Sequence, residues 1–321
     1  MKVESATLRT TLRGHEASVN AAAFSPDGLL LITSAGGDAS APGRRGKIGE
    51  TLVWDIARQK LAVALVWHRQ PVLAVAVSPD GETLATGSRD QTVAIWNIGR
   101  GLWDAVIGVC ERSLRGHSGA VTALAFSPDG GLLATGDDDE SIRLWETRDW
   151  RQVASFAAPQ RAPCQLAFSP DGRQLACACR SRAPVVVWDV ARRSDAFELR
   201  LPRGERFEGR GLAYSHDGQK LAVLSADEIR VWDVSSCQVL TQFNARGSEV
   251  IAYSPRGDWL ATGGWDAGTH AAVRFFNAGT GAVRAHLQGH KLPVTAIAFS
   301  PAGNLLASAG RDMLVNVWEF D

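Results

Sequence analysis

The chain has 321 residues, of which 45% are hydrophobic and 21% are charged, and its 34 basic and 34 acidic residues give a net charge of zero. This composition is typical of a soluble globular protein with enough apolar material for a large core, and the lack of a basic excess argues against nucleic acid or an anionic membrane as the partner. The first residues lack the apolar segment of a signal peptide, and no apolar run reaches the ~18 residues that span a bilayer.

The five cysteines follow no spacing typical of a disulfide framework. An odd count of this kind predicts reduced thiols and a cytoplasmic location. Cys177 and Cys179 are two apart on an expected strand and therefore share a face. We interpret them as small core residues rather than metal ligands, because no His or third Cys lies beside them in sequence. No motif for a cofactor or a metal is found.

A turn of the form Ser-x-x-Gly follows an apolar segment seven times, and an aromatic-polar dipeptide follows each turn. The turns are residues 25–28, 78–81, 127–130, 169–172, 215–218, 254–257 and 300–303. The dipeptides are residues 54–55, 96–97, 145–146, 188–189, 232–233, 276–277 and 318–319. Successive turns are 39 to 53 residues apart, and a recurrence of this length indicates a repeat architecture.

The third repeat shows the expected elements in chain order. Residues 121–126, 132–136, 141–145 and 151–156 are predicted strands, separated by turn residues such as Pro128 and Gly130. The strands are more apolar than strict alternation requires, so each small antiparallel sheet should be covered on both faces. A ring of such sheets is a β-propeller.

The repeats resemble those of the WD40 family over essentially the whole chain. The family's Gly-His pair is present as Gly14-His15, Gly116-His117 and Gly289-His290, with Trp67-His68 as a variant. The resemblance implies an all-β fold: one seven-bladed β-propeller of four-stranded antiparallel blades. The approximate repeats are residues 13–65, 66–114, 115–156, 157–201, 202–243, 244–287 and 288–321. Residues 5–12 are expected to supply the last strand of the seventh blade and so close the ring.

The resemblance also implies a buried hydrogen-bond network of His, Ser or Thr, Asp and Trp within a blade. The matching residues are His68, Thr86, Asp90 and Trp96 in repeat 2, His117, Thr135, Asp139 and Trp145 in repeat 3, and His290, Ser308, Asp312 and Trp318 in repeat 7. The same residue types could form a hydrolytic triad. We prefer the structural interpretation, because a nucleophile is needed once and not at three equivalent positions.

Repeats 4 to 6 depart from this pattern. Their positions for the His hold Pro159, Glu205 and Asn244, and repeats 4 and 5 also lack the turn Asp. We expect this part of the ring to be the least rigid.

The loops between the second and third strands are long in repeats 1 and 6, and long loops on a rigid scaffold often carry function. Together with neighbouring loops of repeats 2 and 7, they offer a candidate partner-binding set: Arg44, Arg45, Lys47, Arg89, Trp265 and Arg311. Repeat 3 places the acidic residues 137–140 beside them. Two interpretations of these charged residues remain: they belong to ordinary solvated loops, or they line a groove for an acidic or phosphorylated peptide.

A second candidate site lies on the opposite rim, in the long segment between Trp96 and His117. Its apolar residues Leu102, Trp103 and Ile107 either form a docking site or fold back onto the blade as local packing.

These patterns favour a protein-interaction scaffold that binds a partner protein or peptide without catalysis and is monomeric by itself. One alternative is a regulatory or sensor module of a larger kinase or NTPase system. The other is an enzyme or metal site at the central channel, which would need His, Asp or Glu on the innermost strands. Such residues are nearly absent from the strands expected there, for example Val72–Val77 and Val121–Phe126.

Overall fold

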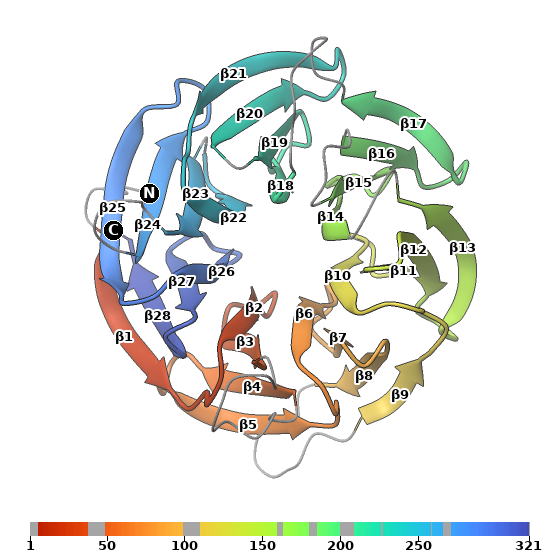
Figure 1. The fold of residues 1–321 in the computed structure, drawn as a ribbon, viewed down its shortest axis with the longest axis horizontal. Helices are drawn as coiled ribbons and strands as arrows, with labels where there is room; N and C mark the ends of the chain where they lie inside the picture. The colour runs from red at the N-terminus through yellow and green to blue at the C-terminus, as the bar shows by residue number, and fades with distance from the viewer. Residues whose placement is uncertain are drawn as a thin grey trace.

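The computed structural model describes residues 6–37, 49–98, 110–158, 163–179, 185–199, 209–225, 227–257, 259–265 and 271–320. Within these ranges every regular element is a β-strand, and the strands form seven four-stranded antiparallel sheets. The sheets are arranged as the blades of a propeller around one axis (Figure 1). This confirms the predicted fold.

The blades are named here in ring order, and their strands are given from the axis outward. Blade 1 contains β2 (Val19–Phe24), β3 (Leu30–Ala35), β4 (Glu50–Asp55) and β5 (Lys60–Val66). Blade 2 contains β6 (Val72–Val77), β7 (Thr83–Ser88), β8 (Val93–Asn97) and β9 (Cys110–Leu114). Blade 3 contains β10 (Val121–Phe126), β11 (Leu132–Asp137), β12 (Ser141–Glu146) and β13 (Arg151–Ala157).

Blade 4 contains β14 (Pro163–Phe168), β15 (Gln174–Cys179), β16 (Val185–Asp189) and β17 (Ser194–Leu199). Blade 5 contains β18 (Gly211–Tyr214), β19 (Lys220–Leu224), β20 (Glu228–Asp233) and β21 (Gln238–Asn244). Blade 6 contains β22 (Ser248–Tyr253), β23 (Trp259–Gly264), β24 (Ala271–Asn277) and β25 (Val283–His290). Blade 7 contains β26 (Val294–Phe299), β27 (Leu305–Gly310), β28 (Leu314–Glu319) and, outermost, β1 (Thr7–Arg13).

Blade 7 is built from both ends of the chain, as the sequence predicted. Strand β1 pairs antiparallel with β28, with Thr7 opposite Glu319 and Arg13 opposite Leu314. The two strands lie side by side in Figure 1. The pairing removes the free edge that β28 would otherwise expose, and an exposed edge invites association with other strands.

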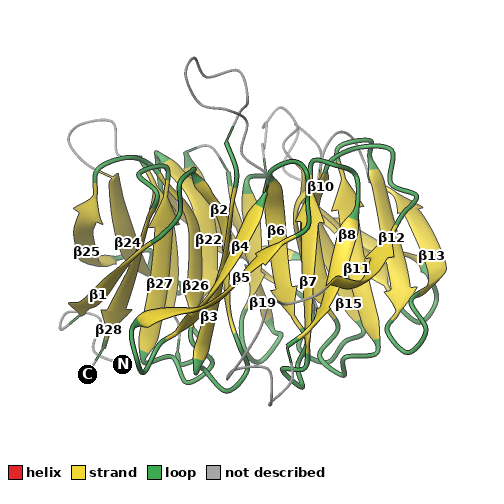
Figure 2. Ribbon diagram, turned by 90° about the horizontal axis from the view of Figure 1, so that it is seen from below, coloured by secondary structure: helices red, strands yellow, loops and turns green. Residues whose placement is uncertain are grey.

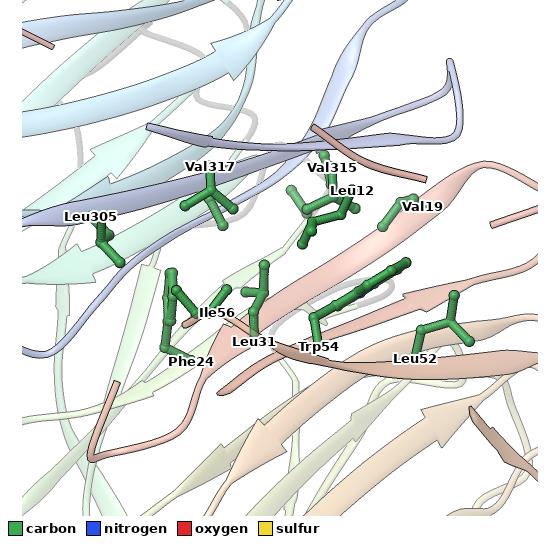
Figure 3. Packing of buried hydrophobic residues seen from close by; sticks show 13 residues of the cluster. Leu12, Val19, Phe24, Leu31, Leu52, Trp54, Ile56, Leu305, Val315 and Val317 are labelled. Carbon is green, nitrogen blue, oxygen red and sulfur yellow. The ribbon is translucent and has the colours of Figure 1, made fainter. Parts of the chain in front are cut away.

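The hydrophobic core is divided among the interfaces between neighbouring blades. Leu31 and Ile32 follow each other on β3 and point to opposite faces, yet both are fully buried. Leu31 packs toward blade 7 and Ile32 toward blade 2. Figure 3 shows the interface between blades 7 and 1, where Val315 and Val317 face Trp54 and its neighbours. Burial on both faces explains why the strands are more apolar than an alternating pattern.

The Ser-x-x-Gly turns lie on the rim where β28 ends, called here the lower rim (Figure 2). Each turn Gly has a positive φ, for example +71° at Gly28 and +73° at Gly130, which L-residues with a Cβ rarely adopt. A Cβ at Gly28 would lie 3.8 Å from Cδ of Pro301, the turn proline of blade 7. The turns of the first and last blades are therefore also neighbours, which is a second sign of ring closure.

The opposite, upper rim carries two kinds of loop. One kind joins the outermost strand of a blade to the innermost strand of the next, and the other joins the second and third strands of one blade. No helix in the described part of the chain is long and apolar enough to cross a membrane.

Candidate protein-binding rim

A network of His, hydroxyl, carboxylate and Trp groups underlies the upper rim in four blades. In blade 2, His68 Nδ1 lies 3.0 Å from Asp90 Oδ2, His68 Nε2 lies 2.8 Å from Thr86 Oγ1, and Trp96 Nε1 donates to the same oxygen at 3.0 Å. All four groups are satisfied when Nδ1 donates to the carboxylate and Nε2 accepts the hydroxyl proton. Blade 7 has the same arrangement, made by His290, Ser308, Asp312 and Trp318.

In blade 3 the predicted network carboxylate, Asp139, is wrong, because Asp137 takes that place. His117 Nδ1 lies 2.6 Å from Asp137 Oδ2, whereas Asp139 is exposed and only its main-chain N–H contacts Asp137. Thr135 and Trp145 occupy their predicted places, with His117 Nε2 2.6 Å and Trp145 Nε1 2.9 Å from Thr135 Oγ1. The spacing pattern selected Asp139 because it aligns with Asp90, but Asp137 ends the buried strand and its carboxylate already reaches the imidazole.

Blade 1 has a fourth network that the sequence analysis missed. His15 Nδ1 lies 2.8 Å from Glu50 Oε1, His15 Nε2 lies 2.7 Å from Thr33 Oγ1, and Trp54 Nε1 donates to Thr33 at 2.7 Å. Glu50 stands four residues before Trp54, so the six-residue spacing between the turn Asp and the Trp does not identify it. The separation of 18 residues between His and the hydroxyl is shared by all four networks and would have identified Thr33.

The carboxylates of the networks in blades 2, 3 and 7 are held ionised. Burial by itself would raise the pKa of Asp137, but hydrogen bonds from His117 and Ser141 outweigh it and lower the pKa to about 2. Burial would likewise raise the pKa of Asp90. Hydrogen bonds, of which the one from His68 has the largest effect, lower this pKa to about 2. The pKa of Asp312 is shifted in the same direction, with burial again opposing the hydrogen bond from His290.

These shifts predict acid sensitivity. A carboxyl whose pKa is lower in the folded protein contributes stability above its ordinary value of 3.8, and that contribution is lost as the pH falls toward 2. We expect Asp90 and Asp137 each to contribute about 2 kcal/mol at neutral pH. Urea unfolding at pH 6, 4 and 3 should therefore show a falling free energy of unfolding, with a smaller fall in an Asp137→Asn variant. An equal fall in both proteins would contradict this assignment.

Blade 6 replaces the network with an arginine. Arg274 Nη2 donates to the carbonyl oxygens of Ala245 and Arg246, at 3.2 and 2.6 Å, and to Ser248 Oγ at 2.9 Å. Asn244, which takes the position of the His in sequence, is exposed and accepts a bond from the Arg246 N–H. Pro159 and Glu205, the corresponding residues of repeats 4 and 5, lie outside the described residues.

One consequence is a buried hydroxyl without a partner among the described residues. Thr262 aligns with Thr86 and is fully buried, but its Oγ1 makes no hydrogen bond. The indole N–H that serves Thr86 has no counterpart here, because Phe276 takes the position of the Trp.

We expect a Thr→Val substitution to change the free energy of unfolding differently at Thr86 and at Thr262. Thr86→Val should lower the free energy of unfolding by about 1–3 kcal/mol, since it leaves His68 and Trp96 without their shared partner. Thr262→Val should be neutral or stabilising, since it removes a hydroxyl that is buried unpaired. Chemical denaturation of the two variants beside the wild type measures the difference, and equal losses would contradict the assignment.

Three of the predicted partner-binding residues occupy one equivalent position. Arg89, Trp265 and Arg311 are each the first residue after the second strand of a blade. Each main-chain N–H is bonded to the preceding loop on the same rim, with Arg89 and Arg311 donating to Pro71 and Pro293 at 3.0 Å, and Trp265 donating to Gly247 at 2.7 Å. A rigid main chain therefore presents all three side chains at the upper rim.

These side chains are accessible. Arg89 is exposed, Trp265 is 43% exposed, and the Arg311 side chain is 56% exposed and lies 3.9 Å from Glu249. The other predicted members, Arg44, Arg45 and Lys47, lie outside the described residues. So do Leu102, Trp103 and Ile107 of the second candidate site.

The structure adds further exposed residues to the upper rim. Arg69 and Trp67 flank His68, while Lys291 and Leu292 follow His290. These residues stand beside the network His residues and not in the long loops, so loop length did not point to them. In blade 3, Asp138, Asp139 and Glu140 are exposed on the same rim, while Asp137 is buried in the network.

The axis of the ring is lined by side chains that join neighbouring blades. Asn20 Nδ2 donates to the Val72 carbonyl at 2.9 Å, and Leu212 N–H donates to Gln165 Oε1 at 3.0 Å. Among the described residues, no three His, Cys, Asp or Glu side chains are placed to hold a metal ion together.

The repeated blades and their shared rim define a WD-repeat propeller. The family model described as "WD domain, G-beta repeat" matches residues 6–41, 59–97, 108–146, 240–268 and 281–319, more than half of the chain. The chain therefore belongs to the WD40 family. The matches leave out residues 147–239, the part of the ring where the sequence departs most from the network pattern.

Several curated proteins are similar to the chain. The transcriptional corepressor LEUNIG_HOMOLOG of Arabidopsis thaliana is 24% identical over 312 residues, which cover 96% of this chain and 36% of that protein. Periodic tryptophan protein 2 of the same plant is 26% identical over 277 residues, covering 85% and 25%. The protein groucho of Drosophila melanogaster is 28% identical over 156 residues, covering 48% and 20%. The chain thus spans between a fifth and about a third of the length of these relatives.

Proposed function

We propose that this propeller is a non-catalytic scaffold that binds an acidic segment of a partner protein on the upper rim of blades 6, 7, 1 and 2. Propellers of this family generally bind proteins, and one of the relatives is named as a corepressor. The observation that carries the proposal is the equivalent, main-chain-anchored placement of Arg89, Trp265 and Arg311.

The chemistry of the rim favours an acidic or phosphorylated segment. Arg89, Lys291 and Arg69 are exposed cations, and Arg311 has a single long contact to Glu249 that solvent screens. Guanidinium groups bind carboxylates and phosphates through paired donors. Trp265 and Trp67 add exposed aromatic area of the kind found at binding hot spots.

Comparative affinity capture tests this proposal. The wild type is compared with an Arg89→Glu/Trp265→Ala/Arg311→Glu variant, using lysate of the source organism. We expect proteins retained by the wild type to be lost from the variant, and retention to weaken as salt is raised. A matched control, Arg148→Glu/Arg256→Glu, changes the charge equally at two exposed arginines of the lower rim. Equal retention by all three, or equal loss in both variants, would contradict binding at the upper rim.

A further inference from the structure

Blade 4 carries two cysteines at positions where blade 3 carries a pair of network residues. Counted from the pairing of the second strand with the tryptophan of the blade, Cys177 aligns with Thr135, and Cys179 aligns with Asp137. In blade 3 both of these side chains contact the imidazole of His117, each at 2.6 Å. Two side chains at these positions can therefore hold one group between them, and in blade 4 both are thiols.

The two sulfur atoms lie close together in an apolar place. Cys177 Sγ is 3.6 Å from Cys179 Sγ, and the two residues are not joined in a disulfide. Both are buried, in the core cluster between blades 3 and 4 that also contains Leu144 and Trp188. Their burial agrees with the core residues that the sequence predicted. The short distance between the sulfur atoms is a further feature, because two sulfurs so placed can share one ion.

A disulfide between these two cysteines does not suit a β-strand. Residues two apart on a strand are separated by about 6.7 Å, and their Cβ atoms point the same way, so these are about equally far apart. A disulfide needs Cβ atoms about 3.5–4.5 Å apart. An ion between the sulfur atoms spans more, because it adds two bonds of about 2.3 Å each, the length of a zinc–thiolate bond. A linear unit of this kind needs the sulfurs about 4.6 Å apart, so each moves by only about 0.5 Å from the observed 3.6 Å separation.

The surroundings of the pair favour a soft ion that is satisfied by two ligands. Thiolates select soft metals, and Cu(I) is the monovalent ion among them. Structural zinc takes four ligands, whereas no third His, Cys, Asp or Glu side chain joins this pair within the part of the chain that the structure describes. Cu(I) is stable with two sulfur ligands, and the apolar neighbours offer no carboxylate for a hard ion.

We propose that Cys177 and Cys179 bind one Cu(I) ion as two thiolates. Each cysteine gives up its thiol proton to water as its sulfur bonds to the ion, so one ion replaces two protons. Cys179 is the last residue of β15, at the upper rim, and the ion reaches the pair from that end. The ion joins two positions of one strand, as the imidazole of His117 does in blade 3. The site lies in blade 4 and is independent of the proposed binding rim of blades 6, 7, 1 and 2.

Titration of the full chain with Cu(I) tests the proposal. The titration is done without oxygen and in competition with bathocuproine disulfonate, a chelator that forms a coloured Cu(I) complex. We expect the wild type to hold one ion and Cys177→Ala/Cys179→Ala to bind it at least about 100-fold more weakly, since losing even a group behind a metal ligand costs about 10- to 100-fold. The control Cys110→Ser/Cys237→Ser removes two half-buried thiols elsewhere and should bind like the wild type. Equal affinity in all three proteins, or equal loss in both variants, would overturn the proposal.

Two further measurements separate loss of the site from loss of the fold. Thermal unfolding is followed with and without Cu(I), and we expect the ion to raise the melting temperature of the wild type and of Cys110→Ser/Cys237→Ser but not of Cys177→Ala/Cys179→Ala. The curves without the ion show whether each variant is folded. X-ray absorption of the loaded wild type should show two sulfur neighbours of the copper. Nitrogen or oxygen neighbours, or a melting temperature that rises equally in all three proteins, would contradict binding between these two cysteines.

Discussion

Deletion of residues 1–12 is expected to lower the free energy of unfolding by about 5 kcal/mol, which approaches the whole stability of many domains. The deletion removes all but the last of the six residue pairs between β1 and β28, together with the buried side chain of Leu12. It also exposes the edge of β28 and uncovers part of the core between blades 7 and 1. Thermal and urea unfolding of the truncated chain beside the wild type measure the effect.

Two leucines of β1 provide a matched control. Leu12 is 3% exposed and Leu8 is 47% exposed, although both belong to the same strand. We expect Leu12→Ala to cost about 2–5 kcal/mol and Leu8→Ala less than about 0.5 kcal/mol. An unchanged melting curve after deletion of residues 1–12 would contradict closure of the ring by this strand.

Asp137→Asn is expected to lower the free energy of unfolding by about 3 kcal/mol, because it breaks a fully buried network. Asp137 accepts hydrogen bonds from His117, from the main chain of Asp139 and from both the main chain and side chain of Ser141. The substitution keeps the volume of the side chain but removes its charge and one acceptor oxygen. Urea unfolding at pH 7 measures the loss.

Asp139→Asn is the control for this prediction, since Asp139 is the residue that repeat spacing would select. Its side chain is exposed, and a surface substitution of this kind should change stability by less than about 0.5 kcal/mol. A larger loss for Asp139→Asn than for Asp137→Asn would show that the carboxylate in the network had been assigned wrongly.

Much of the fold was predictable because the repeats impose it. Turn glycines such as Gly28 and Gly130 occur where the backbone needs a positive φ, and apolar runs such as Leu31-Ile32 occur where both faces of a sheet are buried. The strand expected before Gly14-His15 had no partner within its own repeat, so it was expected to pair with the last repeat. The four strands of the third repeat form close to their predicted positions.

The details of the networks were less predictable, because spacing in sequence does not measure the reach of a side chain. Asp137 and Glu50 contact their His residues from positions two residues away from the expected one. Blade 6 shows a different solution, since Arg274 crosses to the neighbouring loop, and Thr262 has no hydrogen-bond partner among the described residues. On the rim, the equivalence of Arg89, Trp265 and Arg311 depends on main-chain bonds that only the structure reveals.

Amine cross-linking of the captured complex, read by mass spectrometry, tests the proposed function most directly. The chain has five lysines, Lys2, Lys47, Lys60, Lys220 and Lys291, which makes the map easy to interpret. Lys291 lies on the upper rim beside Leu292, whereas Lys220 begins β19 next to a lower-rim turn. We predict cross-links between the partner and Lys291, with none to Lys220. Cross-links to Lys220 without any to Lys291 would contradict binding at the upper rim.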